Sequence, residues 1–255
     1  MKILLIPDAH VNQDTDLSRF VGLGNIIVDK KPDTIISMGD FLAMESISHW
    51  DKDKRLTMEG KRYLEEVSTA RAARKLIDTP TYNLQERQRE LKTRQYKPKK
   101  YYLMGNHEVW IDKYTEQNPA MKDYIDLDSD LGLTENGWEI LPFGEYLELH
   151  DILFTHVPLN GARQSISGVD ICRIAGRYTN KSLVFGHTHR FETANMNRLG
   201  GGSLIQVLTC GCFFEDKADG FGFNNWKGVI FLDVFAPGRF EISTHSIERL
   251  RYELD

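Results

Sequence analysis

The sequence has few cysteines and no long apolar run, and each shortage excludes a class of protein. Its 255 residues include only three cysteines, Cys172, Cys210 and Cys212. An odd, small number without repeated spacing argues against a disulfide framework and is typical of a reducing compartment. No apolar segment approaches the roughly 20 residues that span a bilayer, and the N-terminal run "MKILLI" lacks the features of a signal peptide. We therefore expect a cytoplasmic protein that does not cross a membrane.

The chain also lacks a strong overall charge. Its formal net charge of −5 gives no general reason to expect binding to nucleic acid or to a membrane surface. The charge is uneven, because residues 50–100 contain 15 Lys or Arg and 8 Asp or Glu, a balance of +7 that leaves −12 for the rest. A hydrophobic fraction of 41% in a chain of this length suffices for one sizeable core. We expect a single domain, residues 1–255.

Apolar runs predict a sheet interleaved with helices in the first half and a strand-rich second half. Buried strands are expected at 2–6, 34–38 and 101–104, with a helix at 16–30. Turn signals between short apolar runs favour hairpins in the second half. The strands expected there are 138–141, 146–149, 152–155, 182–185, 203–208, 228–234 and 239–246, with a helix around 164–177. The pattern indicates an α/β fold with a two-layer sheet core and flanking helices.

Residues 50–100 form a helical, basic insertion between two of these strands. The first helix has an apolar stripe made of Leu64, Val67, Ala70, Ala73 and Ile77. Pro80 is expected to stop this helix, and a second, very polar helix follows. The insertion is either a solvated helical hairpin, as charge runs usually are, or a basic cap over the functional site that attracts a polyanion. The apolar stripe could also pack on a second subunit, so a homo-oligomer through the 50–100 helices is a further hypothesis.

Polar motifs follow the predicted strands. The first three strands end in "PDAH" (7–10), "GD" (39–40) and "GNHE" (105–108). Ligands of open α/β sheets bind beyond the carboxyl ends of the strands, so these motifs indicate one site. A histidine follows the strand at 152–155, and "GHTH" (186–189) follows the strand at 182–185. The candidate site residues are Asp8, His10, Asp40, Asn106, His107, His156, His187 and His189.

All of these side chains are oxygen or imidazole donors, and none is a thiolate. Such a set suits a hard or borderline divalent metal, such as Mn, Fe or Zn. One metal needs four to six donors, and this set supplies more. Since Asp40 offers two oxygens that can bridge, two metals roughly 3.5–4 Å apart would use the whole set. Each motif alone is weak, and their order along the chain carries the inference.

Together with "FTHVP" (154–158), these motifs resemble those of the calcineurin-like metallophosphoesterase family. The resemblance implies a four-layer α/β/β/α sandwich, with the helical insertion placed after the second strand. It also implies two divalent metal ions, Mn foremost and Fe, Zn or Ni as alternatives. One ion would be held by Asp8, His10 and His189. The other would be held by Asn106, His156 and His187, with Asp40 bridging the two. His187 and His189 would thus clamp a pair of ions.

The resemblance further implies a metal-dependent hydrolase in which a metal-bridging hydroxide attacks a phosphoester. The catalytic residues would be His107, Asn106 and Asp40, with His107 contacting the phosphate and protonating the leaving oxygen. Glu108 would have a supporting role at most. The expected substrate is a nucleotide, a nucleic acid end or another small phosphoester. A DNA nuclease of the same family and a catalytically silent binding scaffold are the alternatives.

One departure from the family concerns the sequence "GDFLAMES". Ala43 stands where the protein Ser/Thr phosphatases carry a second Asp, and no Arg-Gly follows. This argues against that branch of the family and removes the usual carboxylate partner of His107. His49 is a further candidate for substrate contact, and a loop histidine without a role is the equal alternative.

Overall fold

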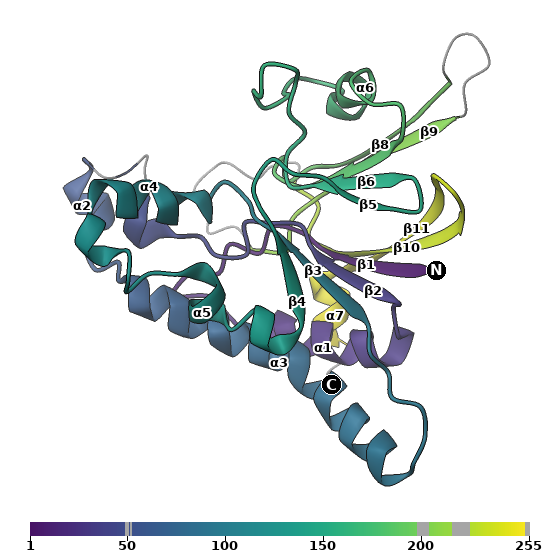
Figure 1. Ribbon diagram of the computed structural model, residues 1–255, viewed down its shortest axis with the longest axis horizontal. Helices are drawn as coiled ribbons and strands as arrows, with labels where there is room; N and C mark the ends of the chain where they lie inside the picture. Colours follow the sequence, from purple (N-terminus) through teal and green to yellow (C-terminus); the bar gives the residue numbers. More distant parts are fainter. Residues whose placement is uncertain (49–50, 52, 198–203, 216–224, 253–255) are drawn as a thin grey trace.

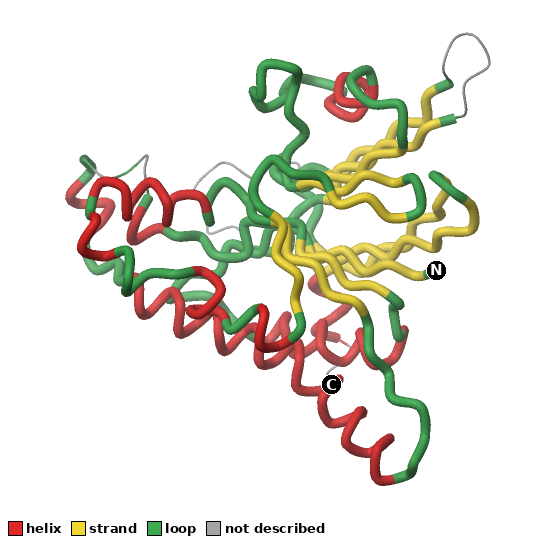
Figure 2. The backbone as a smooth tube through the Cα atoms, viewed as in Figure 1, coloured by secondary structure: helices red, strands yellow, loops and turns green. Residues whose placement is uncertain are grey.

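Two β-sheets packed face to face form the centre of the protein, and helices cover their outer faces (Figures 1 and 2). The computed structural model describes residues 1–48, 51, 53–197, 204–215 and 225–252. His49, Trp50, Lys52 and Ser203 therefore lie outside the described residues. The layers run helix, sheet, sheet, helix, so the four-layer α/β/β/α architecture is confirmed.

The first sheet contains the three strands expected in the first half of the chain. Its order is β11 (Arg239–Ser246), β10 (Gly228–Ala236), β1 (Lys2–Ile6), β2 (Thr34–Ser37), β3 (Lys99–Leu103) and β4 (Trp138–Leu141). Strands β1 to β4 are parallel, and the β10–β11 hairpin joins antiparallel to β1. The carboxyl ends of the parallel strands therefore lie along one edge.

The second sheet is mixed. Its order is β5 (Leu147–Leu149), β6 (Ile152–Thr155), β7 (Ser182–Phe185), β9 (Ile205–Cys210) and β8 (Phe191–Met196). Strands β6, β7 and β9 are parallel, whereas β5 and β8 pair antiparallel with β6 and β9. The expectation of hairpins between predicted strands holds for β5–β6 and β10–β11. Strand β8 was missed, because "FETANM" places its one buried residue, Ala194, among exposed and half-buried neighbours.

Alternation along β1 shows how the layers are built. Ile3 and Leu5 point into the core between the two sheets, whereas Leu4 and Ile6 point into the core under the helices. Side chains alternate between faces with a period of two, so a strand buried on both faces is apolar throughout. A third core lies between the second sheet and α6 (Ile171–Gly176).

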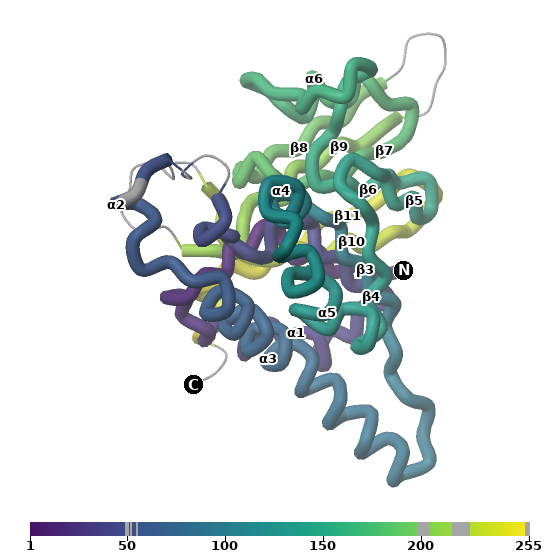
Figure 3. Tube along the Cα trace, turned by 60° about the vertical axis from the view of Figure 1, so that its left-hand side comes forward, coloured from purple at the N-terminus to yellow at the C-terminus, as the bar shows by residue number. Residues whose placement is uncertain are grey.

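Three helices cover the first sheet: α1 (Ser18–Lys30), α3 (Tyr63–Glu90) and α7 (Ile247–Tyr252). Figure 3 shows α1 and α3 side by side beneath the strands. The shorter helices α2 (Arg55–Met58), α4 (Val109–Gln117) and α5 (Leu127–Leu131) lie on the side of the carboxyl ends of β1 to β3 (Figure 1). No helix within the described residues is long and apolar enough to cross a membrane.

The expectation that Pro80 ends a helix is wrong, because α3 runs through it from Tyr63 to Glu90. Proline lacks an N–H and leaves a carbonyl one turn earlier without its helical partner. Gly24 of α1 packs at this turn, where a Cβ would lie 2.5 Å from the carbonyl oxygen of Leu76 and 3.0 Å from the Pro80 ring. Close packing on α1 therefore stabilises a turn that helix propensity disfavours.

The apolar stripe of α3 packs on its own domain. Val67, Ala70, Ala73 and Ile77 are buried in the core beneath the first sheet. Leu64, the fifth expected member, is 75% exposed. The second half of α3 projects from the body of the molecule (Figures 1 and 3). The roles of residues 50–100 as a cap and as an oligomer contact stay predictions.

Candidate metal centre

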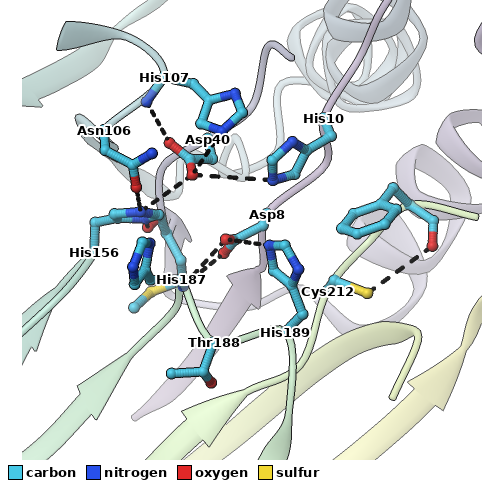
Figure 4. A network of polar contacts seen from close by, with 12 residues as sticks. Asp8, His10, Asp40, Asn106, His107, His156, His187, Thr188, His189 and Cys212 are labelled. Carbon is cyan, nitrogen blue, oxygen red and sulfur yellow. Dashed lines mark hydrogen bonds and ion pairs between the residues drawn. The ribbon is translucent and has the colours of Figure 1, made fainter. Parts of the chain in front are cut away.

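Loops after five strands converge at one end of the two sheets. They carry all the candidate side chains: Asp8 and His10 after β1, Asp40 after β2, Asn106 and His107 after β3, His156 after β6, and His187 and His189 after β7 (Figure 4). The convergence follows from topology, because β1 to β3 are mutually parallel, as are β6 and β7. Residues up to 181 positions apart in sequence thus share one site.

Four of these residues have a left-handed backbone. The angle φ is 43° at His10, 48° at Asp40, 65° at His187 and 58° at His189. Such a conformation is disfavoured for any residue other than glycine by about 1–2 kcal/mol, and strain of this kind clusters at functional sites. In a continuous strand, the two histidines of "HTH" would point the same way. Because the chain turns at both, their side chains enter two different groups.

The first group is formed by Asp8, His10 and His189. One potential ligand atom from each lies within 4.8 Å of the others, and Nε2 of His189 is 3.3 Å from Oδ2 of Asp8. The backbone N–H of His187 donates to both oxygens of the buried Asp8 carboxylate, at 3.1 and 3.2 Å. Burial raises the pKa of Asp8, but the hydrogen bond with His189 and the nearby imidazoles outweigh this and lower it.

The second group is formed by Asp40, His156 and His187, again with ligand atoms within 4.8 Å. Nδ1 of His156 donates to the carbonyl oxygen of Met38 at 2.8 Å, which turns Nε2 toward the site. There, Nε2 lies 3.3 Å from Oδ2 of Asp40 and 3.1 Å from Oδ1 of Asn106. Burial lowers the pKa of His156, but the charge of Asp40 and its hydrogen bond prevail and raise it to about 10.

Asp40 connects the two groups, because it belongs to the second and also forms a third set of close ligand atoms with His10 and His107. Its Oδ2 is 3.9 Å from Nε2 of His10, 3.9 Å from Nε2 of His107 and 3.3 Å from Nε2 of His156. Burial raises the pKa of Asp40, but the charges of His156 and His107 lower it well below its usual range. One ionised carboxylate therefore faces imidazoles of both groups, which is the position a bridging ligand needs.

The donor atoms fit divalent cations. Nε2 of His10 is buried and has no hydrogen-bond partner, although burial of a polar atom without one is costly. Burial and the charge of His107 lower the pKa of His10 to about 3, so the ring is neutral and carries a free lone pair on one nitrogen. A neutral imidazole beside ionised carboxylates is the form in which these side chains bind metals.

Glu108 joins two loops of the site through hydrogen bonds to their backbone. Its position in the motif "GNHE" indicates this role only weakly. Glu108 is fully buried. Its carboxylate accepts hydrogen bonds from the backbone N–H groups of Asp40, Phe41 and Gly105 at 2.9, 2.8 and 2.8 Å, and from the hydroxyl of Tyr102 at 2.8 Å. It therefore ties the loop after β2 to the loop after β3. Among sequence signals, only its place directly after the candidate residues could have suggested this.

His107 has a backbone partner in place of the missing carboxylate. Its Nδ1 lies 2.6 Å from the carbonyl oxygen of Ala43. The ring stacks on Trp110, with centroids 4.0 Å apart, and meets the edge of His10 at 4.6 Å. The backbone N–H of His107 donates to Oδ1 of Asp40 at 2.9 Å. The imidazole is thus held on three sides.

The segment from Gly211 to Phe214, directly after β9, also contributes to the site. The N–H of Phe213 donates to the carbonyl oxygen of Asp8 at 2.7 Å. The ring of Phe214 contacts those of His10 and His189 edge-on, with centroids 4.9 Å away in both cases. This segment therefore shields the first group from one side.

A cavity of about 500 Å³ opens beside the first group. His10, His107 and His189 reach into it. Its described wall also includes five carboxylates, one guanidinium and two large aromatic rings, which belong to Asp14, Asp16, Glu45, Asp51, Glu215, Arg19, Trp110 and Phe214. Of the described part of residues 50–100, only Asp51 lines the cavity.

Comparison with known proteins gives one family. A family model described as calcineurin-like phosphoesterase matches residues 1–191. A search of curated proteins finds no match.

Two solved structures match over nearly the whole chain at low identity. One is a conserved uncharacterized protein from Streptococcus pneumoniae TIGR4, described as a predicted phosphoesterase. It is 10% identical over 97% of this chain and 90% of its own, with a TM-score of 0.39. The other is 13% identical over 96% of this chain and 99% of its own, with a TM-score of 0.42.

Proposed function

Since the chain belongs to the calcineurin-like phosphoesterase family, we propose that it hydrolyses phosphoester bonds with two divalent cations held at the strand ends. The observation that carries the proposal is that the group of Asp8, His10 and His189 and the group of Asp40, His156 and His187 are joined by a third, made of His10, Asp40 and His107. Asp8, His10 and His189 would hold one ion. Asn106, His156 and His187 would hold the other, and Asp40 would bind both.

Two cations supply chemistry that side chains alone lack, because they lower the pKa of a coordinated water and neutralise the phosphate oxygens. Enzymes accelerate phosphate monoester hydrolysis by up to ~10²¹-fold, whereas a positioned general acid contributes only about 10²–10⁴-fold. His107 is therefore assigned the part that one imidazole can play, which is to donate a proton to the leaving oxygen. Asn106 would hydrogen-bond the phosphate from its place beside the second group.

We propose a small phosphoester as the substrate, with nucleotides and nucleic acid ends included. A volume of about 500 Å³ is within the usual range for small-molecule sites, about 300–1,000 Å³. The five carboxylates around the cavity disfavour a long polyanion, which favours a small substrate over the nuclease alternative. Manganese as the native metal and a cytoplasmic location remain part of the proposal.

The test is reconstitution of metal-stripped protein with Mn²⁺, Zn²⁺ or Mg²⁺, assayed on p-nitrophenyl phosphate and bis(p-nitrophenyl) phosphate. We expect turnover that requires added metal. Absence of turnover with all three metals would favour the scaffold, and diester preference together with DNA cleavage would favour the nuclease. In the Asp40→Ala variant, we expect loss of activity and of bound metal. Retention of both metals and of activity would contradict the bridging assignment.

A further inference from the structure

The orientation of His107 depends on one backbone carbonyl. A carbonyl oxygen only accepts hydrogen bonds, so the 2.6 Å contact with Ala43 requires the hydrogen on Nδ1 of His107. The other nitrogen, Nε2, then faces Asp40 and the cavity. In catalytic triads, a carboxylate fixes the histidine tautomer in this way. Here the peptide between Ala43 and Met44 has that task, so its orientation is decisive.

The loop that carries this peptide is strained. Asp40 and Met44 have a left-handed backbone, with φ of 48° and 51°. Each such residue costs about 1–2 kcal/mol, so external contacts must hold the loop. The first part is held by Glu108 and by pairing with Val11, whose carbonyl oxygen accepts from the N–H of Ala43 at 2.9 Å. These contacts reach only as far as the N–H of Ala43. The peptide between Ala43 and Met44 must therefore be held by contacts to the residues that follow it.

Glu66 holds the backbone that follows this peptide, where the side chain of Glu45 also contacts Asn12 and Lys61. Glu66 lies in the first turn of α3 and is 1% exposed. Its carboxylate accepts from the N–H of Glu45 at 2.7 Å and from the N–H of Ser46 at 3.0 Å, and it also bonds the Ser46 hydroxyl. Among the described residues, no Lys or Arg lies within ion-pair distance of Glu66. A buried carboxylate is costly unless it is hydrogen-bonded, so Glu66 and the loop at 45–46 depend on each other.

We propose that Glu66 is a positioning residue for His107. By holding Glu45 and Ser46, it fixes the peptide after Ala43, whose carbonyl orients the imidazole. The insertion thereby contributes to the reaction through its first helical turn. The inference rests on the proposed function. In the step concerned, Nε2–H of His107 gives its proton to the leaving oxygen as the P–O bond breaks. The ring is left neutral, with Nδ1–H still on Ala43, and is reprotonated from water.

The first test compares Glu66→Gln with Glu65→Gln, an exposed neighbour on the same turn. In Glu66→Gln, the amide NH₂ would face either the N–H of Glu45 or the two donors of Ser46, which now hydrogen-bond to the carboxylate. Both variants and His107→Ala are assayed on aryl phosphoesters of the type that the wild type hydrolyses, with phenol or 2,4-dinitrophenol as leaving group. Loss of a general acid costs up to about 10²–10⁴-fold when the leaving group needs a proton, and little when it does not.

We expect Glu66→Gln to lower kcat at least about 10-fold on the phenyl ester and no more than about 2-fold on the dinitrophenyl ester, with KM and metal content unchanged. His107→Ala should show the same selectivity more strongly, and Glu65→Gln should match the wild type. An equal loss on both esters, or no loss, in Glu66→Gln would overturn the inference, as would a His107→Ala variant without selectivity. A wild type inactive on every ester would instead overturn the proposed function.

A second readout does not depend on turnover. In Zn²⁺-loaded protein with ¹⁵N-labelled histidine, the short bond from Nδ1 of His107 should give a low-field proton resonance, identified by its loss in His107→Ala. This resonance should persist in Glu65→Gln and shift or disappear in Glu66→Gln. If Glu66→Gln does not fold, Ser46→Ala removes one of the three donors to Glu66 and should produce the same changes to a smaller extent. An unchanged resonance and unchanged kinetics in the variant that folds would refute the role of Glu66.

Discussion

Glu108→Gln tests how far one buried carboxylate organises the candidate metal centre. One carboxylate oxygen accepts from the N–H groups of Asp40 and Gly105, and the other from the N–H of Phe41 and the hydroxyl of Tyr102. If the glutamine oxygen takes the first position, its NH₂ group faces the other two donors and the more distant N–H of Leu42, which lies 3.4 Å from the second oxygen. The tyrosine hydroxyl can rotate and accept, but the N–H of Phe41 has no alternative partner.

One buried donor left without a partner costs about 1–3 kcal/mol. In a protein of this size, about 1 kcal/mol shifts Tm by about 2–4 °C, so the expected fall is about 2–12 °C. The assay is thermal unfolding of metal-free protein followed by circular dichroism. The control is Glu116→Gln, an exposed acid on α4, which should leave Tm unchanged. A Tm of Glu108→Gln within about 1 °C of the wild type would refute the assigned network.

Three further predictions concern the ligand groups, pH and packing. His189→Ala should lose preferentially the ion shared with Asp8 and His10, and His187→Ala the other; equal loss of both ions in metal analysis would contradict the clamp. For pH, the folded pKa of His156 is about 10 against 6.5 unfolded, so its contribution to stability is complete below pH 6.5 and is lost as pH rises through 10. The free energy of unfolding of metal-free protein in urea should therefore fall between these values, and a His156→Gln variant with the same slope would exclude His156 as the cause. Gly24→Ala should destabilise the protein by about 1–3 kcal/mol through overpacking against Leu76, whereas Gly161→Ala, with nothing within 4 Å, should be neutral in the same urea titrations.

Sequence patterns were sufficient to predict most strands and the set of side chains that meet at the site. In Lys2–Ile6 and Ser182–Phe185, every residue after the first is apolar and buried, and such short apolar runs are typical of strands buried on both faces. The carboxyl ends of parallel strands share an edge, so polar motifs after them are predicted to converge. Strand β8 was not predictable in this way, because most of its residues are exposed or half-buried. The continuous α3 was not predictable either, because packing against Gly24 stabilises the helical turn that contains Pro80.

The sequence by itself thus determined which residue types follow which strands, and with them the class of chemistry. Only the tertiary structure decided how these residues act on one another. The left-handed turns at His187 and His189 separate neighbours in sequence into two groups. Contacts to the carbonyl of Ala43 and to the carboxylates of Glu66 and Glu108 join segments that are 20 to 68 residues apart. The physical reason is that every residue has a backbone carbonyl, and every residue except proline has an N–H. A sequence pattern therefore cannot indicate which backbone group will make a contact in the fold. A strand and the ligands at its end, in contrast, are indicated by the types of their side chains.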